Sequence, residues 1–392
     1  MEICHHRFDQ KEDNKNHIKK SMFNPKIIAF YLPQYYPLKE NDEWWGKGFT
    51  EWYNVGKARP LWKGHHQPRV PTELGYYDLR MPEVREQQAE LARQAGVTAF
   101  CYWHYWFGNG KRLLERVFNE VLESGHPDFP FCLGWANHSW YAKRWNKDTN
   151  QDRLLMEQIY PEGDDRLHFE FLLKAFKDKR YFKVNGCPFL LIYQPDDLPT
   201  DYLLNLKRWT KEAGFPGLFT VANCFDKKKD KSHYLNKGYE SVHYNRLGNV
   251  LYDEYAEYGK IHELLDRIKR LSIQTFNGRP RGAVNYQDYY KRFVEPIDKD
   301  INVIPQIVPQ WDHSPRSGNK AAMIFYNSTP DNFKKQIRMA FDAIKDKPEE
   351  QQIVILKSWN EWGEGNYMEP DNYYGRGFID ALHDIVEEYK NK

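Results

Sequence analysis

The stretch IVILKSWNEWGEG, residues 353–365, decides the fold class, because a buried strand passes directly into a polar and aromatic segment. Residues 353–356 are a continuous β-branched and apolar run, the pattern of a strand that is covered on both faces. Two glutamates, Glu361 and Glu364, follow among large rings. Parallel barrels carry their chemistry at the carboxyl ends of their strands, so this stretch predicts the last strand of a barrel.

Seven similar runs precede this one. The predicted strands are residues 27–32, 97–103, 131–135, 189–193, 218–223, 241–244, 303–308 and 353–358. Amphipathic stretches between or after many of them predict helices at 83–95, 112–124, 165–178, 201–213, 331–346 and 378–390. Eight strands that alternate with helices predict an α/β fold, a (β/α)8 TIM barrel. A doubly wound open sheet is the competing fold, but no G-x-G-x-x-G motif follows the first strand.

The chain exceeds the ~250 residues of a plain barrel. The additional residues fall after the first, third and sixth predicted strands, which indicates long βα-loop insertions at the C-terminal face. No linker or repeat marks a second unit. We therefore expect a disordered leader at residues 1–24 and a single catalytic domain at residues 25–392.

Composition excludes several classes of protein. The formal net charge of +2 provides no field that would gather nucleic acid. No apolar run reaches the ~18 residues of a membrane span, and the polar N-terminus lacks a signal-peptide pattern, so we expect a cytoplasmic protein. Of the five cysteines, Cys101, Cys132 and Cys224 lie in or beside apolar runs, which favours buried thiols over disulfides.

Aromatic residues make up 16% of the chain, with 13 Trp and 27 Tyr. Core packing is one explanation. A sugar-binding cleft is the other, since the C–H face of a pyranose packs on a ring while its hydroxyls find polar partners at the rim.

Glu361 and Glu364 are the candidate catalytic groups. A glutamate beside tryptophan is desolvated, which raises its pKa, whereas a better solvated neighbour stays ionised. Two carboxyl groups tuned apart in this way provide the acid and the base for cleaving a glycosidic bond. The structural alternative is a pair of rim glutamates that form ion pairs with Lys357 and Arg376.

Aromatic, amide, imidazole and carboxylate groups gather at the predicted strand ends and in the first insertion, which we expect to cover the cleft. An aromatic residue at a strand end is more often a wall residue than a ligand contact, but six strand ends present such groups. The expected substrate-binding residues are Tyr31, Gln34, Trp45, Glu51, Trp52, Tyr102, His104, Trp106, Trp135, Asn137, Tyr193, Gln194, Trp311, Asn360 and Trp362.

The segment SWNEWGEGNYMEP, residues 358–370, resembles the N-E-W-x-E-G signature of glycoside hydrolase family 99, the endo-α-mannosidase clan. The N-terminal half resembles the WbsX-type branch of that clan. The matching stretches are AFYLPQYYP (29–37), DEWWGKGFTEWYNV (42–55), QPRVPTELGYYDL (67–79), AGVTAFCYWHYWF (95–107) and LGWANHSW (133–140).

The resemblance implies retention through the sugar's own 2-hydroxyl. Glu361 would act as the base on that hydroxyl, which attacks C1. Glu364 would protonate the leaving oxygen and then deprotonate the acceptor. No cofactor is implied. WbsX-type proteins tend to be associated with polysaccharide assembly, so the resemblance leaves the direction and the acceptor open.

Three functions follow from these observations. The first is cleavage or transfer of a glycosyl unit, with retention, on a cell-surface or complex polysaccharide. The second is a glycosyltransferase of O-antigen or capsular polysaccharide biosynthesis. The third is a catalytically inactive glycan-binding barrel.

A metal site is not expected. The first predicted strand has no His-x-His and the chain has no H-E-x-x-H motif. The D-x-D pattern at Asp298 and Asp300 precedes the seventh strand, on the face opposite the chemistry, and is interpreted as a solvated turn.

Overall fold

The structure is a computed structural model that describes residues 23–142, 153–226, 228–248 and 250–392. Most of the expected leader, residues 1–22, lies outside the described residues. Among the described residues, the ring of Phe23 lies 5.6 Å from that of Phe341 and 5.7 Å from that of Tyr389.

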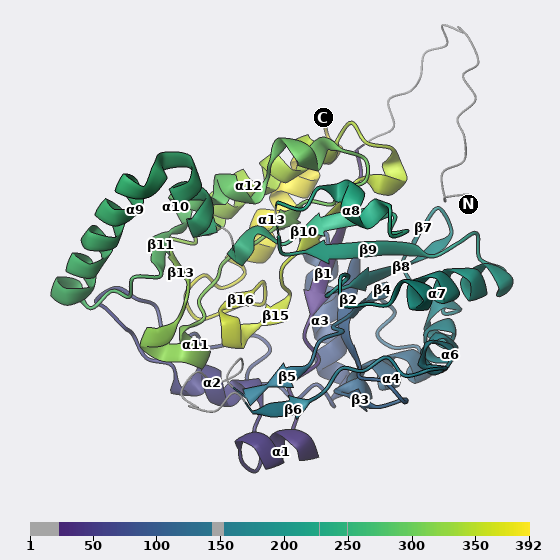
Figure 1. The fold of residues 1–392 in the computed structure, drawn as a ribbon. Coiled ribbons are helices and arrows are strands. Elements are labelled where there is room, and N and C mark those ends of the chain that lie inside the picture. Colours follow the sequence, from purple (N-terminus) through teal and green to yellow (C-terminus); the bar gives the residue numbers. More distant parts are fainter. Residues whose placement is uncertain (1–22, 143–152, 227, 249) are drawn as a thin grey trace, which may run out of the picture.

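Eight parallel strands form the barrel (Figure 1), in the spatial order β10-β9-β8-β4-β2-β1-β14-β12. They are β1 (Lys26–Tyr31), β2 (Ala99–Trp106), β4 (Phe131–Trp135), β8 (Cys187–Ile192), β9 (Phe219–Cys224), β10 (Ser241–Tyr244), β12 (Gln306–Ile307) and β14 (Ile353–Leu356). All eight predicted strands are confirmed, with shifts of a few residues at some ends.

A parallel bridge between Val242 and Val303 closes the ring. Val242 donates its amide to Asn302 O at 2.8 Å, and Ile304 donates to Val242 O at 2.9 Å. The sheet order alone leaves β10 and β12 as edges, and these bonds connect them. The (β/α)8 barrel is thus confirmed, with its shortest strand at the seam.

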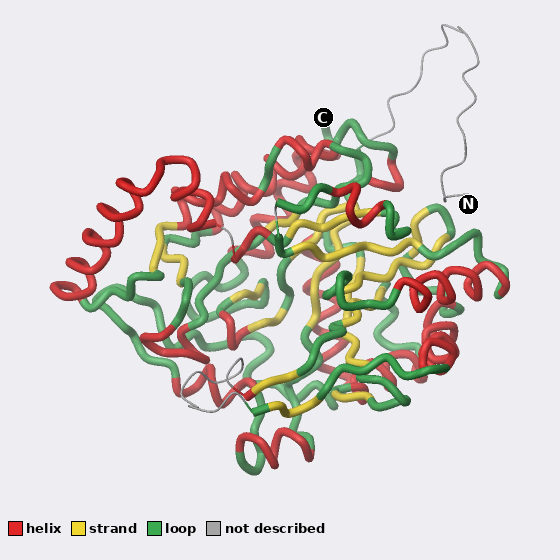
Figure 2. Tube along the Cα trace, viewed as in Figure 1, coloured by secondary structure: helices red, strands yellow, loops and turns green. Residues whose placement is uncertain are grey.

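Helices cover the outside of the barrel, as Figure 2 shows by their position around the strands. They are α3 (Pro82–Ala95), α4 (Glu115–Ser124), α6 (Asp164–Phe176), α7 (Thr200–Glu212), α8 (Lys231–Leu235), α12 (Pro330–Ile344) and α13 (Gly377–Lys390). The six predicted helices correspond to all of these except the short α8. Two of them end at left-handed glycines, Gly96 (φ 86°) and Gly125 (φ 76°).

The insertions after the first and third barrel strands, β1 and β4, build one side of the C-terminal face. The insertion after β1 contains α1 (Lys39–Trp45) and α2 (Glu51–Lys57). The insertion after β4 contains β5 (Trp140–Tyr141) and β6 (Leu154–Met156), which pair antiparallel. Short strands β3 (Arg112–Leu113) and β7 (Lys183–Val184) pair antiparallel with β2 and β8. The α2 helix contacts the segment that carries Glu361 and Glu364.

The insertion after β10 is the largest. It contains α9 (Val250–Asn277), β11 (Ala283–Asn285) and α10 (Tyr286–Tyr289), and β11 pairs in parallel with β13 (Ile324–Tyr326) from the loop after β12. Buried side chains such as Val284, Tyr286 and Phe325 give this subregion a core of its own. In Figure 1 the α9 helix projects beyond the barrel.

Two further expectations concern single residues. Cys101, Cys132 and Cys224 are free and buried, as predicted. The solvated turn predicted at Asp298 is wrong, because its carboxylate is fully buried and pairs with Arg246 Nη1 at 2.9 Å.

In the part of the chain that the structure describes, no helix has the length and apolarity to cross a membrane.

Candidate active site

The segment after β14 forms a small hairpin above the barrel. Strands β15 (Asn360–Glu361) and β16 (Asn366–Tyr367) pair antiparallel, and a 3-10 turn, η6 (Trp362–Glu364), joins them. Gly365, with φ 55°, ends this turn. A β-carbon at Gly365 would lie 2.7 Å from the β-carbon of Asp312, so only glycine permits both the left-handed backbone and this close approach.

Asn360 fastens this hairpin to the first strand. Its side chain accepts a hydrogen bond from Leu32 N at 2.7 Å and donates one to Leu32 O at 3.0 Å. The Tyr35 hydroxyl donates to Asn360 O at 2.6 Å and accepts from Trp362 N at 2.9 Å. These buried bonds fix the backbone on either side of Glu361.

Asp312 holds the turn that carries Glu364 in place. Its buried carboxylate accepts hydrogen bonds from Gln67 Nε2 at 2.6 Å and contacts His65 Nε2 at 2.8 Å, and its amide donates to Glu364 O at 2.8 Å. Burial alone would raise the pKa of Asp312, but the bond with His65 and the charge of Arg69 hold that pKa well below its usual value. A permanently ionised group therefore anchors the backbone that carries Glu364.

Glu361 and Glu364 form a carboxyl pair whose members lie close enough for each to shift the pKa of the other. Trp103 Nε1, from β2, donates to Glu361 Oε1 at 3.3 Å. Both glutamates are only partly accessible, and the Glu364 side chain is 18% exposed. Two acidic groups in contact at a nearly closed site cannot both ionise without cost, so the pair tends to share one proton.

Arg316 determines which carboxylate is charged. Its Nη1 lies 2.5 Å from Glu364 Oε1, and its Nε lies 3.1 Å from Glu51 Oε2. Arg316 belongs to the short helix α11 (Ser314–Ser317), whereas Glu51 begins α2. The guanidinium thus joins two insertions to the turn that carries Glu364, and its charge is directed at Glu364.

The two pKa values are displaced in opposite directions. Burial, the adjacent charge of Glu364 and the hydrogen bond between them raise the pKa of Glu361 well above its usual value. Burial would also raise the pKa of Glu364, but Arg316 and the bond from Glu361 outweigh it and lower that pKa to about 2. These directions place the proton of the pair on Glu361 and the negative charge on Glu364.

Gly363 is required between the two glutamates for steric reasons. A β-carbon at this position would lie 2.0 Å from Glu51 Oε2 and 3.0 Å from Arg316 Nε. Any side chain would displace the ion pair that polarises Glu364. The glycine in the motif is thus explained by the close approach of Glu51.

Three further groups complete the surroundings of the pair. The Lys357 ammonium lies 5.3 Å from the ring centroid of Trp311, and His313 Nε2 lies 3.9 Å from Glu364 Oε1. The ring of Tyr193 meets that of Trp103 edge to face at 5.5 Å. Rings and cations therefore stand on two sides of the carboxyl pair.

The structure places only some of the expected substrate-binding residues here. Glu51, Tyr193 and Trp311 lie next to groups that contact the pair. Gln34 is fully buried and neither polar atom of its amide has a hydrogen-bond partner, which leaves it available to a ligand or a water molecule. Trp45 is half-buried and packs at 6.1 Å from Phe49 in the first insertion.

A second group of expected contacts faces the helix layer instead. Side chains alternate along a strand, so neighbours on β2 point to opposite sides of the barrel wall. His104 contacts His168 of α6 at 2.9 Å, and Trp106 Nε1 donates to the Asp164 carboxylate at 3.0 Å. The residues placed in this layer, away from the carboxyl pair, are Tyr31, Tyr102, His104, Trp106 and Trp135.

The remaining expected contacts hold loops in place. Trp52 Nε1 donates to Tyr77 O at 2.7 Å, and Trp362 Nε1 donates to Glu369 Oε2 at 2.6 Å. Asn137 binds the backbone of Gln194 through both ends of its amide, at 2.8 and 2.7 Å. The loop-supporting residues are Trp52, Asn137, Gln194, Asn360 and Trp362.

The structural alternative for the glutamates finds little support in the described contacts. Arg376 pairs with Glu73 at 2.6 Å and bonds to Gln94. Arg316, which nothing in the sequence singled out, takes the place that was expected for Arg376.

Within the described residues no group of three or more His, Cys, Asp or Glu is arranged to hold a metal ion.

Comparisons with known proteins agree with this geometry. The structure is similar to a GH99 endo-α-mannosidase of Bacteroides thetaiotaomicron in complex with BIS-TRIS-propane, with a TM-score of 0.56 and 11% identity over 94% of this chain and 98% of that one. It is also similar to a protein described as glycoside hydrolase-like, with a TM-score of 0.55 and 14% identity over 93% and 94% of the chains. At these identities the likeness concerns the fold.

Sequence comparisons give the family. A protein of Xanthomonas campestris pv. campestris named WxcX is 32% identical over 358 residues, which is 91% of this chain and 48% of that protein. The chain thus spans about half the length of this relative. The family profile described as Glycosyltransferase WbsX matches residues 27–382, so this chain belongs to the WbsX family.

Proposed function

We propose that this protein transfers or hydrolyses a glycosyl unit with net retention, and that Glu361 and Glu364 are its catalytic residues. The observation that carries the proposal is the arrangement of the two carboxyl groups on one turn, with Arg316 Nη1 at 2.5 Å from Glu364 Oε1 and Trp103 Nε1 at 3.3 Å from Glu361 Oε1. Carboxyl pairs with separated pKa values provide acid and base to the same glycosidic bond. The WbsX family and the GH99-like fold support the same assignment.

The resemblance to family 99 favours substrate-assisted chemistry, in which the protein supplies an acid and a base but no carboxylate nucleophile. The sugar's 2-hydroxyl would then attack C1, one carboxylate would take its proton, and the other carboxyl group would protonate the leaving oxygen. Substrates would need a 2-hydroxyl trans to the leaving group, as in α-mannosides and α-rhamnosides.

The charge distribution favours one allocation of the roles. Glu364, ionised beside Arg316, is the ready base, and protonated Glu361 is the ready acid. The family resemblance implies the reverse allocation. Because each group shifts the pKa of the other, a substrate that binds beside them can change which one holds the proton, and so decides between the two allocations.

The dependence of turnover on the leaving group of the substrate shows which glutamate is the acid and which is the base. In Glu361→Gln and Glu364→Gln we expect turnover of an oligosaccharide to fall by ~10²–10⁴-fold. An aryl glycoside with an activated leaving group needs no acid, so it should restore turnover only in the variant that lacks the acid. The charge distribution predicts restoration in Glu361→Gln. Restoration in Glu364→Gln would establish the family allocation instead.

The role of the sugar's 2-hydroxyl as the nucleophile is tested with substrates that lack it. A substrate with a 2-deoxy or 2-O-methyl sugar should bind but not react, and the anomeric configuration of the first product, followed by NMR, should be that of the substrate. Glu349→Gln, an exposed position on η5 (Glu349–Gln351), should leave turnover unchanged. Full activity in Glu364→Gln towards every substrate would refute the proposal.

Transfer to a second sugar is favoured over hydrolysis by the family to which the chain belongs, described as a glycosyltransferase. O-antigen or capsular polysaccharide would be the product of such an enzyme. Reactions supplied with a graded series of saccharide acceptors distinguish the two, because transfer yields longer saccharides and hydrolysis yields free sugar. Glycan binding with neither product would indicate the inactive barrel.

A further inference from the structure

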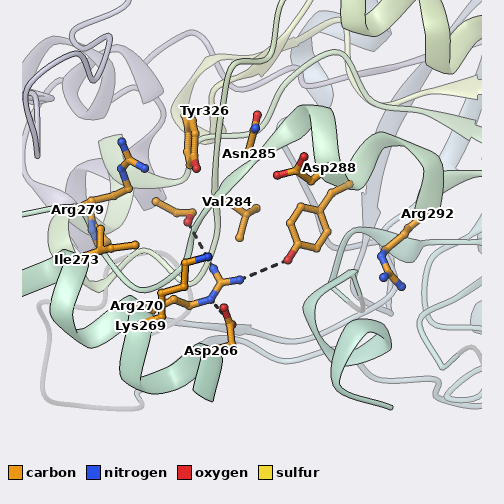
Figure 3. A pocket seen from close by; sticks show the side chains of 13 residues that line it. Asp266, Lys269, Arg270, Ile273, Arg279, Val284, Asn285, Asp288, Arg292 and Tyr326 are labelled. Atoms are coloured by element: carbon orange, nitrogen blue, oxygen red, sulfur yellow. Dashed lines mark hydrogen bonds and ion pairs between the residues drawn. The ribbon is translucent and has the colours of Figure 1, made fainter. Parts of the chain in front are cut away.

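A cavity of about 290 Å³ lies under the α9 helix, outside the active site (Figure 3). The inner side of α9 forms one wall through Asp266, Lys269 and Arg270, and the β11–α10 segment forms the opposite wall. Arg292, from the 3-10 turn η2 (Tyr290–Phe293), and Arg279 stand at its sides. The cavity belongs to the largest insertion, which the proposed chemistry does not use.

The charge of this cavity is positive. Four cationic side chains line it, Lys269, Arg270, Arg279 and Arg292, against two carboxylates, Asp266 and Asp288. Asp266 forms a close ion pair with Arg270, whose guanidinium also bonds to Ala283 O at 3.5 Å and to Tyr289 Oη at 3.3 Å. The chain as a whole has a formal charge of only +2, so this concentration of cations is local. Such a site favours an anion with several oxygens.

A second cavity, of about 240 Å³, adjoins the first. Its lining is aromatic and polar, and it includes Trp62, His66 and Tyr373, with the His66 and Tyr373 rings stacked at 4.0 Å. Ser328 Oγ and Arg69 Nε are buried there without a hydrogen-bond partner. Rings beside unpaired polar atoms suit a pyranose, whose faces are apolar and whose rim is hydroxylated.

Arg279 and Tyr326 line both cavities. The Arg279 guanidinium lies 4.3 Å from the ring centroid of Tyr326 and 5.5 Å from that of Trp62, and its Nε is buried without a partner. An unpaired donor at the junction of an aromatic and a cationic space is placed to meet an oxygen that joins the two halves of one ligand.

We propose that the two cavities together bind a phosphorylated saccharide, with the sugar against Trp62 and Tyr373 and the phosphate or diphosphate among Lys269, Arg279 and Arg292. Arg69 also connects this site to the catalytic turn, since its Nη1 donates to Gly365 O at 3.3 Å. The site is a binding site for carrier-linked sugar, and phosphate binding there does not depend on the proposed function.

Two kinds of ligand would present this phosphate group, a soluble phosphate ester or a lipid headgroup. The outer side of α9 carries apolar side chains that are largely exposed, with Ile261 at 78% and Phe276 at 90%. Leu264, Leu265 and Ile268 are exposed on the same side at helical spacing. A helix with basic and apolar residues of this kind makes binding to lipid vesicles a measurable arm of the test.

The test is calorimetric titration with hexose 1-phosphates of mannose, galactose and glucose, with the free hexoses and with inorganic phosphate. We expect at least one hexose phosphate to bind about tenfold more tightly than either part alone. Arg279→Gln should weaken that binding about tenfold or more, and Lys269→Gln, at an exposed position, should weaken it less. Tyr373→Ala should reduce binding of the hexose phosphate while inorganic phosphate binds as before.

Arg267→Gln is the matched control, because Arg267 lies on the same helix but pairs with Glu263 at 2.6 Å and does not line the cavity. Equal loss in Arg267→Gln and Lys269→Gln, or no binding of any hexose phosphate to the wild type, would overturn the proposal. Titration of Glu364→Gln should give wild-type affinity, which separates this site from the catalytic proposal.

Vesicles of phosphatidylcholine with and without phosphatidylglycerol distinguish the two sources. Sedimentation with the anionic vesicles that is lost in Leu265→Ser, while hexose phosphate still binds, would support the site with a lipid-linked carrier. Hexose phosphate binding without sedimentation would support the site with a soluble carrier.

Discussion

Arg316 Nη1 lies 2.5 Å from Glu364 Oε1, while its Nε lies 3.1 Å from Glu51, so one guanidinium neutralises two carboxylates from distant parts of the chain. Glu361, the other member of the pair, receives a hydrogen bond from Trp103 Nε1 and forms no ion pair among the described contacts. The side on which this carboxyl pair is charged is thus set by a residue outside the motif.

Replacing Arg316 should change the pH dependence of the reaction. Arg316 lowers the pKa of both glutamates, so its loss in Arg316→Gln raises both values. The acid limb of the kcat/KM profile, set by the ionised Glu364, and the basic limb, set by the protonated Glu361, should therefore both move to higher pH. Arg316→Lys should restore part of the shift. Unchanged limbs in Arg316→Gln would contradict this origin of the polarity.

The same variant should also be less stable. Glu51 is fully buried, and removing its partner leaves a charge without compensation, which costs about 3 kcal/mol in similar pairs. Urea unfolding of Arg316→Gln and of the double variant Arg316→Gln, Glu51→Gln should show that the second substitution recovers part of the loss.

Gly363→Ala should damage the site through Glu51. The added β-carbon would meet Glu51 Oε2 at 2.0 Å, so the ion pair with Arg316 must shift. We expect a destabilisation of about 1–3 kcal/mol and a larger fall in kcat than in substrate affinity. Gly56→Ala is the control, since nothing lies within 4 Å of its β-carbon and it is in the α2 helix. Alanine there should be neutral or slightly stabilising.

Glu369 should make stability pH-dependent. Burial, opposed by hydrogen bonds from Trp362, Gln88 and Tyr77, raises the pKa of Glu369 from 4.5 to about 7. The unfolded chain therefore releases this proton at lower pH than the folded protein, so the contribution of Glu369 to the free energy of unfolding decreases between about pH 4.5 and 7. Denaturant unfolding at pH 5 and pH 8 should show wild type losing more stability than Glu369→Gln. Parallel losses would contradict the raised pKa.

Substitution of two tryptophans of β2 should have different effects, one on turnover and the other on stability. Trp103 donates to Glu361, so Trp103→Phe should lower kcat about tenfold with little effect on stability. Trp106 donates to the buried Asp164 carboxylate in the helix layer, so Trp106→Phe should cost about 1–3 kcal/mol and leave kcat unchanged. Thermal unfolding and steady-state kinetics on both variants test the assignment of the strand faces.

The barrel was predictable because each strand is a continuous apolar run. The inward and outward faces of such strands were not, since both are buried and no alternation of polarity marks them. Trp103 and Trp106 are both tryptophans at the end of β2, yet only Trp103 reaches the carboxyl pair. Register with the neighbouring strands, which only the folded structure gives, decides this.

Arg316 shows a different limit. It stands in the short helix α11, and no short motif contains both Arg316 and Glu364, which are 48 positions apart. The glutamates themselves were predictable because their chemistry and their position after β14 occur in one stretch. Residues that tune a site from another loop require the distances.

The bonds between Asn360 and Leu32 join positions that are 328 residues apart. Closing such a long loop has a large entropic cost, which must be met before these contacts stabilise the fold. We therefore expect the turn that carries Glu361 and Glu364 to be among the last elements ordered during folding, when the first and last strands of the barrel come together. Recovery of the proposed activity on refolding should lag behind recovery of the circular dichroism signal, because this turn is held in place only once the ring has closed.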